Sequence, residues 1–406
     1  MNMRSSQQGA INRSVVVALS AVAILAAAAA GFGVTKMIAR PRVAGGPGVE
    51  CRKVGGDART TCYSKLLSSH LVEHGVANAV AMLDTLAHVD PDVAEHAHEF
   101  AHGIGIEAYG RSPDIAGTFA ACGDGYSSGC RHGVIQAYFE SREHVTQPEV
   151  EALCQPFKSP TASRWVLFQC VHGMGHGLTM FYGHDLPRAL NDCDLLVDGW
   201  DRESCYGGAF MENVINATSP HHPATMLAMH GMHHAPENPF KAIDPADPLY
   251  PCSIMAERYL HACYQMQTSV MLNLNHGNIG DAAKSCERAP GPNRAVCFQS
   301  LGRDATSYTA RDPQKTADLC NKARDPDRPA CYFGAAKALV DWTATTDAAF
   351  AFCGVVANSS GGPTCYQALG EEIATLLAGS SEREAQCSRA QQPAAVASCR
   401  RGAGLR

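Results

Sequence analysis

The chain has 406 residues, a formal net charge of -6 and an isoelectric point of about 6.3. This charge balance argues against nucleic acid as a partner, because nucleic-acid-binding proteins usually carry a basic surface. Hydrophobic residues make up 46% of the chain, but only 7% of it is aromatic and alternating β-branched segments are scarce. The composition therefore predicts an all-α fold.

The first predicted element is a hydrophobic helix near the N-terminus. Residues 1–13 form a short tail with two arginines, and residues 14–35 then carry no charge. Such a run is long enough to cross a membrane, so we predict a single-pass signal anchor. The small residues at positions 26–30 leave a cleaved signal peptide open as the alternative. A linker rich in glycine and proline follows at residues 36–56.

Cysteine spacing is the strongest signal in the rest of the chain. Eighteen cysteines form nine couples, with mostly ten or eleven residues between the two members. An even count at this spacing favours disulfides over metal thiolates, and persistent disulfides place the C-terminal body outside the cytoplasm. The couples are Cys51/Cys62, Cys122/Cys130, Cys154/Cys170, Cys193/Cys205, Cys252/Cys263, Cys286/Cys297, Cys320/Cys331, Cys353/Cys365 and Cys387/Cys399.

The spacing between couples predicts a repeat. From Cys252 onward the first members recur every 33 or 34 residues, which is the length of one helical hairpin in a solenoid. The pattern from Cys193 to Cys399 resembles the cysteine-stapled Sel1-like helical repeat proteins and, through its period, the tetratricopeptide repeats. The resemblance implies a superhelical surface for a protein partner and carries over no catalytic residue. We therefore predict disulfide-stapled repeats at residues 251–406 and a histidine-rich, metal-binding helical half at residues 57–250.

Histidine distinguishes the first half. Sixteen of the eighteen histidines lie between His70 and His234. A helix that begins at Asp90, capped by its side chain and followed by Pro91, would carry His98 and His102 on one face. His172 and His176 form a second pair with the same i,i+4 spacing.

The repeat register connects these pairs. His132 and His172 each stand two residues after the second cysteine of their couple, and equivalent positions of stacked units are neighbours. We therefore predict one metal centre for iron, copper or zinc. Its ligands are His98, His102, His132, His172 and His176, with Glu99 or Glu212 moving protons as the catalytic carboxylate.

Several alternatives remain open. His98-Glu99-x-x-His102 matches the zinc-hydrolase pattern, and the three clusters HxxxH, HxxxH and HxxHH resemble the histidine boxes of membrane desaturases, which lie among several membrane helices. Residues 218–251 form an insertion with methionines and histidines that suits copper and could join the site. The glycines after His102 and His172 fit either a close helix crossing or access for a substrate.

The functional prediction is an exported, membrane-tethered metalloenzyme, with redox chemistry favoured over hydrolysis. One alternative is a copper- or zinc-binding module without turnover. The other is a protein-interaction scaffold in which the histidines are structural.

Overall fold

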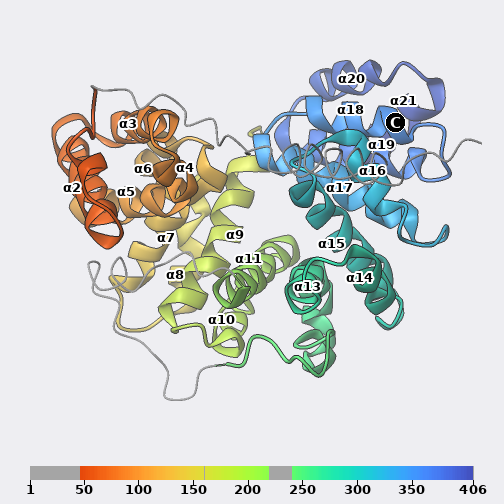
Figure 1. Ribbon diagram of the computed structural model, residues 1–406, viewed down its shortest axis with the longest axis horizontal. Helices are drawn as coiled ribbons and strands as arrows, with labels where there is room; N and C mark the ends of the chain where they lie inside the picture. The colour runs from red at the N-terminus through yellow and green to blue at the C-terminus, as the bar shows by residue number, and fades with distance from the viewer. Residues whose placement is uncertain (1–45, 160, 219–239, 406) are drawn as a thin grey trace, which may run out of the picture. The chain divides into compact units, whose positions relative to one another are not determined.

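The computed structural model describes residues 46–159, 161–218 and 240–405, and these ranges contain helices and turns but no strand (Figure 1). The all-α prediction is confirmed. The predicted membrane helix at residues 14–35 lies outside the described residues. Among the helices that are described, none combines the length and the apolar character needed to span a bilayer.

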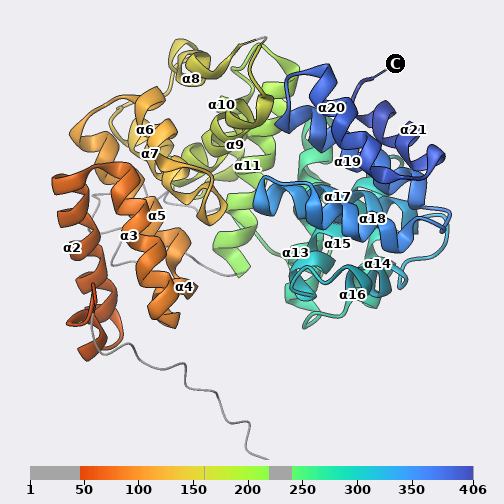
Figure 2. The same cartoon turned by 90° about the horizontal axis from the view of Figure 1, so that it is seen from above.

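In the part of the chain that the structure describes, nine main helices form a continuous row, in which each one packs against the next main helix. The row can be followed in Figures 1 and 2 by the colour change from orange through green to blue. The main helices are α5 (Ala97–Arg111), α7 (Gly129–Glu140), α9 (Arg164–Phe181), α11 (Gly199–Thr218), α13 (Leu260–Leu274), α15 (Asn293–Tyr308), α17 (Arg328–Thr343), α19 (Gly362–Leu376) and α21 (Pro393–Gly402).

Short helices connect the main ones. They are α6 (Ile115–Cys122), α8 (Gln147–Leu153), α10 (Leu186–Cys193), α14 (Ile279–Cys286), α16 (Pro313–Cys320), α18 (Asp347–Val356) and α20 (Ser380–Cys387), together with the 3-10 turns η2 (Tyr126–Ser128), η3 (Gln155–Phe157), η4 (Cys252–Ile254), η5 (Glu257–Tyr259) and η6 (Ser388–Ala390).

All nine predicted disulfides are present. In most of them the first cysteine lies in or beside a short helix and the second lies in the first turns of the main helix that follows. Most of the bridges therefore clamp one helix–turn–helix unit, as the spacing predicted. Nine disulfides suggest an oxidising, extracytoplasmic environment.

The N-terminal end of the row is covered by three further helices, α2 (Asp57–His74), α3 (Val76–Val89) and α4 (Pro91–Glu95), preceded by η1 (Cys51–Lys53). Asp90 caps α4 as predicted, because its carboxylate accepts a hydrogen bond from the Asp92 backbone at 3.1 Å. The prediction of one helix from Asp90 through His102 is wrong, however. The helix ends at Glu95 and α5 begins at Ala97, because His96 departs from helical geometry.

Glycines set how closely the main helices approach. A Cβ on Gly105 of α5 would lie 1.9 Å from the Cys130 carbonyl oxygen, and one on Gly133 of α7 would lie 2.1 Å from that of His102. Only glycine permits this reciprocal contact. The same reciprocal contact, in which a glycine of each helix lies against a backbone carbonyl oxygen of the other, recurs in three later helix pairs. The glycines are Gly175 with Gly208, Gly302 with Gly334, and Gly370 with Gly402. The close-crossing interpretation therefore holds for Gly105 and Gly175.

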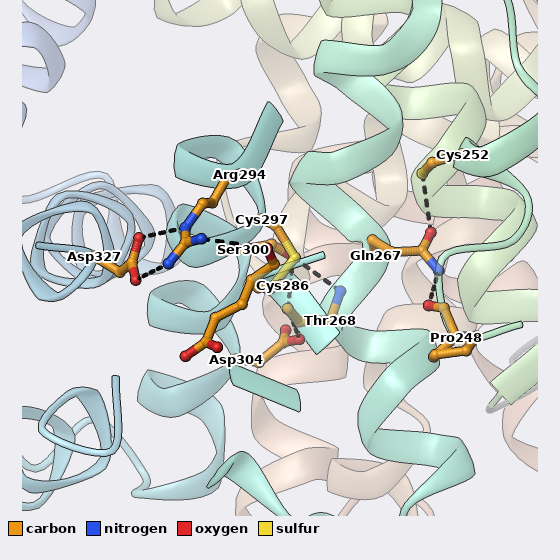
Figure 3. The surroundings of a disulfide bond; sticks show 11 residues. Pro248, Cys252, Gln267, Thr268, Cys286, Arg294, Cys297, Ser300, Asp304 and Asp327 are labelled. Atoms are coloured by element: carbon orange, nitrogen blue, oxygen red, sulfur yellow. Dashed lines mark hydrogen bonds and ion pairs between the residues drawn. A yellow bond between two sulfur atoms is a disulfide. The ribbon is translucent and has the colours of Figure 1, made fainter. Parts of the chain in front are cut away.

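Polar contacts also link consecutive units, as Figure 3 shows around the Cys286–Cys297 bridge. Arg294 of α15 makes a two-pronged ion pair with Asp327, the residue before α17, at 2.8 and 2.6 Å. The buried hydroxyl of Thr268 on α13 bonds to Asp304 of α15 at 2.7 Å. These contacts satisfy polar groups where α15 meets α13 and α17, so they hold α15 in place between its two neighbours.

The described residues from Pro47 onward belong to one compact unit. The predicted halves at residues 57–250 and 251–406 are thus parts of the same row, distinguished by their histidine content. Within this unit α9 also contacts α19, which is far from it in the sequence.

Candidate metal centre

Three histidines from two neighbouring helices form a compact cluster. His98 and His102 project from α5 and His132 projects from α7, with one potential ligand atom of each within 4.8 Å of the others. Their ring centroids are 5.0 to 5.8 Å apart. His102 and His132 are buried and His98 is half-buried. Because imidazole is a good ligand for zinc, copper and iron, this cluster could hold a transition metal ion.

Local structure explains why the three side chains meet. His98 and His102 are one turn apart on α5 and therefore share a face. The Cys122–Cys130 bridge holds the start of α7 in place, and His132 lies two residues after Cys130. The close crossing at Gly133 then brings α7 against the His102 backbone, which leaves His132 beside the α5 pair.

The His98 ring is held in one orientation. Its Nδ1 atom lies 2.7 Å from the backbone carbonyl oxygen of Tyr126. A carbonyl can only accept, so Nδ1 carries the proton and the lone pair is on Nε2. A carbonyl that fixes the far nitrogen in this way is typical of histidines that bind metals. Gly129 makes room for the arrangement, since a Cβ there would lie 3.0 Å from Nδ1.

His132 lies on the side of the cluster that faces α9. Burial, followed by the neighbouring His176 and His98 imidazoles, lowers its pKa well below 6.5, so the ring is neutral. Its Nε2 atom is buried and makes no hydrogen bond within the described part of the chain. A buried nitrogen without a partner is costly, and a metal ion at this position would satisfy it.

The other two predicted ligands lie next to this cluster on α9. The His132 ring stacks on that of His176, with centroids 4.6 Å apart and 18° between the planes. His176 Nε2 is 3.3 Å from His172 Nε2. Burial lowers the pKa of His172 to about 3. The structure thus brings all five predicted imidazoles together, although His132 meets α9 one turn beyond the register-matched His172.

The predicted carboxylates have different surroundings. Glu212 of α11 is fully buried, and its two oxygens lie 2.9 Å from His176 Nδ1 and 3.3 Å from His184 Nε2. Glu99 instead pairs with His96 at 3.1 Å, and burial raises its pKa. Glu212 therefore supports the ligand group directly, whereas Glu99 pairs with a histidine outside it.

Sequence reasoning missed His184 and the Tyr126 carbonyl. His184 reaches Glu212 from the turn after α9, where it and Gly183 both have positive φ. The Gly183-His184 pair signals only a helix end, and the direction of the His184 side chain depends on the tertiary structure.

Most of the predicted insertion at residues 218–251 lies outside the described residues. Gly103, one of the glycines after His102, lines a cavity of about 410 Å³ between α2 and α5.

No family model, no curated protein and no solved structure matches this chain. The resemblance to Sel1-like and tetratricopeptide repeats stays a prediction about architecture. What the geometry defines is a largely buried group of imidazoles in a disulfide-bonded, all-helical protein, with three of them close enough to share one metal ion.

Proposed function

We propose that this protein is an exported copper metalloenzyme with redox activity, in which His98, His102 and His132 hold the ion. The observation that carries the proposal is the convergence of three imidazole nitrogens from two helices within 4.8 Å. Nitrogen ligands suit zinc, copper and iron, and among divalent first-row metals copper binds such ligands most tightly.

The number of ligands supports catalysis over a structural role. Structural metal sites usually have four protein ligands, whereas catalytic sites have three and leave a position for water or substrate. The half-buried His98 offers that position a route to solvent, while His102 and His132 hold the inner side.

The carboxylates support redox chemistry over hydrolysis. A hydrolytic zinc site needs a carboxylate that activates the bound water, and Glu99 is the residue that the zinc-hydrolase pattern assigns to this role. The Glu99 carboxylate pairs with His96 in this chain. A metal that changes oxidation state does not need Glu99 to activate a bound water, so this pairing favours redox chemistry over hydrolysis.

The compartment and the tether complete the proposal. Nine disulfides suggest an oxidising space, and the uncharged residues 14–35 would attach the body to the membrane. Membrane fractionation tests the tether: full-length protein should sediment with membranes and resist extraction by salt, and a soluble product would contradict it.

A metal-retention assay tests the site. Full-length protein made in an oxidising compartment is exposed to copper, challenged with a chelator, desalted and analysed by mass spectrometry. The His98→Gln/His132→Gln variant should lose one equivalent of copper that the wild type keeps. The matched control is His70→Gln/His74→Gln, an i,i+4 pair on α2 with centroids 4.4 Å apart, which should keep it.

The outcome also separates the alternative functions. Unchanged copper in the His98→Gln/His132→Gln variant would exclude His98 and His132 as its ligands, and a wild type that keeps no copper would leave a protein-interaction scaffold with structural histidines. An enzyme is supported if the bound copper changes oxidation state reversibly and if small anions change its absorption spectrum. Copper that is bound but passes quickly to chelators would instead indicate a metal-handling module.

A further inference from the structure

A second pair of imidazole nitrogens faces inward beside the first cluster. His172 and His176 lie one turn apart on α9, and their Nε2 atoms are 3.3 Å apart. Two nitrogens bound to one tetrahedral zinc-like ion at about 2.0–2.1 Å would be about 3.3–3.4 Å apart. The pair therefore already has the separation that one shared ion requires.

The far nitrogen of His176 is fixed by a carboxylate. Glu212 approaches Nδ1 at 2.9 Å, and its other oxygen lies 3.3 Å from His184. A carboxylate with both oxygens facing ring nitrogens acts as an acceptor, so Nδ1 of His176 donates the proton. The Nε2 atom then carries a lone pair. A carboxylate–histidine contact of this kind is the usual support of a metal-binding histidine.

The far side of His172 is fixed in a similar way. Its Nε2 faces His176, whereas its Nδ1 faces α11, where a Cβ on Gly207 would lie 3.5 Å away. The Ser204 backbone on α11 favours the protonated ring and so raises its pKa, against the larger effect of burial, as an accepting carbonyl oxygen does. With the His172 proton on Nδ1, both Nε2 lone pairs point at each other, and two lone pairs at this distance repel unless a cation lies between them.

We propose that His172 and His176 hold a second transition metal ion through their Nε2 atoms, separate from the ion of the first cluster, with Glu212 as the positioning residue. The stacked rings of His132 and His176 make the two sites adjacent. Two protein ligands leave positions for water or another small ligand. This site depends on its own contacts, so it can be present whether or not the first cluster binds metal.

The test counts metal equivalents with the full-length, disulfide-bonded chain. Metal-free protein is titrated with Co²⁺, whose absorption spectrum reports nitrogen coordination, and the retained metal is measured after desalting. A His98→Gln/His102→Gln/His132→Gln variant should retain one equivalent, which is lost when His172→Gln/His176→Gln is added. No retained metal in the folded triple variant would overturn the second site.

The proposed function is judged by a different variant. His172→Gln/His176→Gln alone should retain one equivalent, held by the first cluster, and loss of that equivalent on adding His132→Gln supports the first site. Failure of the two proposals is thus distinguishable. The His70→Gln/His74→Gln pair on α2 should leave both equivalents in place.

A milder variant covers the case in which the triple variant does not fold. Glu212→Gln keeps the volume of the side chain but removes its charge, so His176 loses its fixed orientation. One of the two Co²⁺ affinities should then fall about 10–100-fold while the other is unchanged. Two unchanged affinities would overturn the proposal, and so would an equal loss of both, which a general structural defect would cause.

Discussion

His132 and His176 stack face to face, with their ring centroids 4.6 Å apart, although they belong to different disulfide-bonded units. Within the histidine group, this stack joins the histidines of α5 and α7 to those of α9. The α5–α7 and α9–α11 helix pairs are each closed by their own reciprocal glycine contact. The α7–α9 contact, with Gly173 and Gly177 against Ile135, brings the two halves of the histidine group together.

The neutral state of the buried rings predicts a pH dependence of stability. Burial lowers the pKa of His172 to about 3 and that of His132 well below the 6.5 of an ordinary histidine. Between these values the unfolded chain binds more protons than the folded chain, so the free energy of unfolding of the metal-free protein falls as the pH drops from 6.5 towards 3. Above 6.5 this contribution is fully present.

Denaturant unfolding of metal-free protein at several pH values across this window measures the effect. His172→Gln removes one of the titrating groups, so the variant should lose less stability on acidification than the wild type does. Carboxylates titrate in the same range, but they are common to both proteins and cancel in the comparison. Parallel pH curves for the two proteins would contradict the prediction.

Much of this architecture could be predicted because its determinants are local. The partner of each cysteine lies within one hairpin, and i,i+4 spacing puts His98 and His102 on one face whatever surrounds the helix. The fixed period also implied that units stack, so that histidines from separate units would approach one another.

What the sequence could not determine depends on how helices cross. Repeat register pointed to His132 and His172 as direct neighbours, but the packing of α7 on α9 places His132 against His176 one turn further on. The contact between Glu99 and His96 depends on the break between α4 and α5 at His96. The capping pattern at Asp90 predicts where a helix begins, but it does not predict this break. These features arise from tertiary packing, which overrides local signals.

The glycine contact between α5 and α7 predicts a large effect of a small substitution. Gly133→Ala puts a Cβ 2.1 Å from the His102 carbonyl oxygen, so the two helices must separate. We expect a loss of about 1–3 kcal/mol or more in the free energy of unfolding. Gly110→Ala, near the end of α5, meets no atom within 4 Å and should be neutral or slightly stabilising. Similar thermal unfolding curves for the two variants would argue against the close crossing.

Paired removal of disulfides separates stability from metal binding. Cys286→Ala/Cys297→Ala opens a loop with a sequence separation of 11 between α14 and α15, which carry none of the proposed ligands, and should cost about 2–3 kcal/mol without changing retained metal. Cys122→Ala/Cys130→Ala frees the start of α7, two residues before His132, and should weaken metal binding as well. Denaturant unfolding and metal analysis on both variants make the comparison. Equal metal affinity in the two variants would show that the bridge does not position His132.

The last prediction concerns the room that Gly129 leaves for His98. A Cβ at this position would lie 2.7 Å from the His98 backbone oxygen and 3.0 Å from its Nδ1 atom. Gly129→Ala should therefore disturb the contact with the Tyr126 carbonyl and lower the metal affinity of the first cluster about 10–100-fold.

Gly125→Ala is the matched control for Gly129→Ala. It lies in the same connection between α6 and α7, its φ is negative, and a Cβ there meets no atom within 4 Å. Titration of both variants with Co²⁺ compares the affinities directly. The contact with the Tyr126 carbonyl keeps the His98 lone pair on Nε2. Loss of this contact should therefore reduce the affinity for Co²⁺ even in a chain that folds normally. An unchanged affinity in folded Gly129→Ala would mean that the carbonyl does not orient a ligand, and His98 would then be a packing residue.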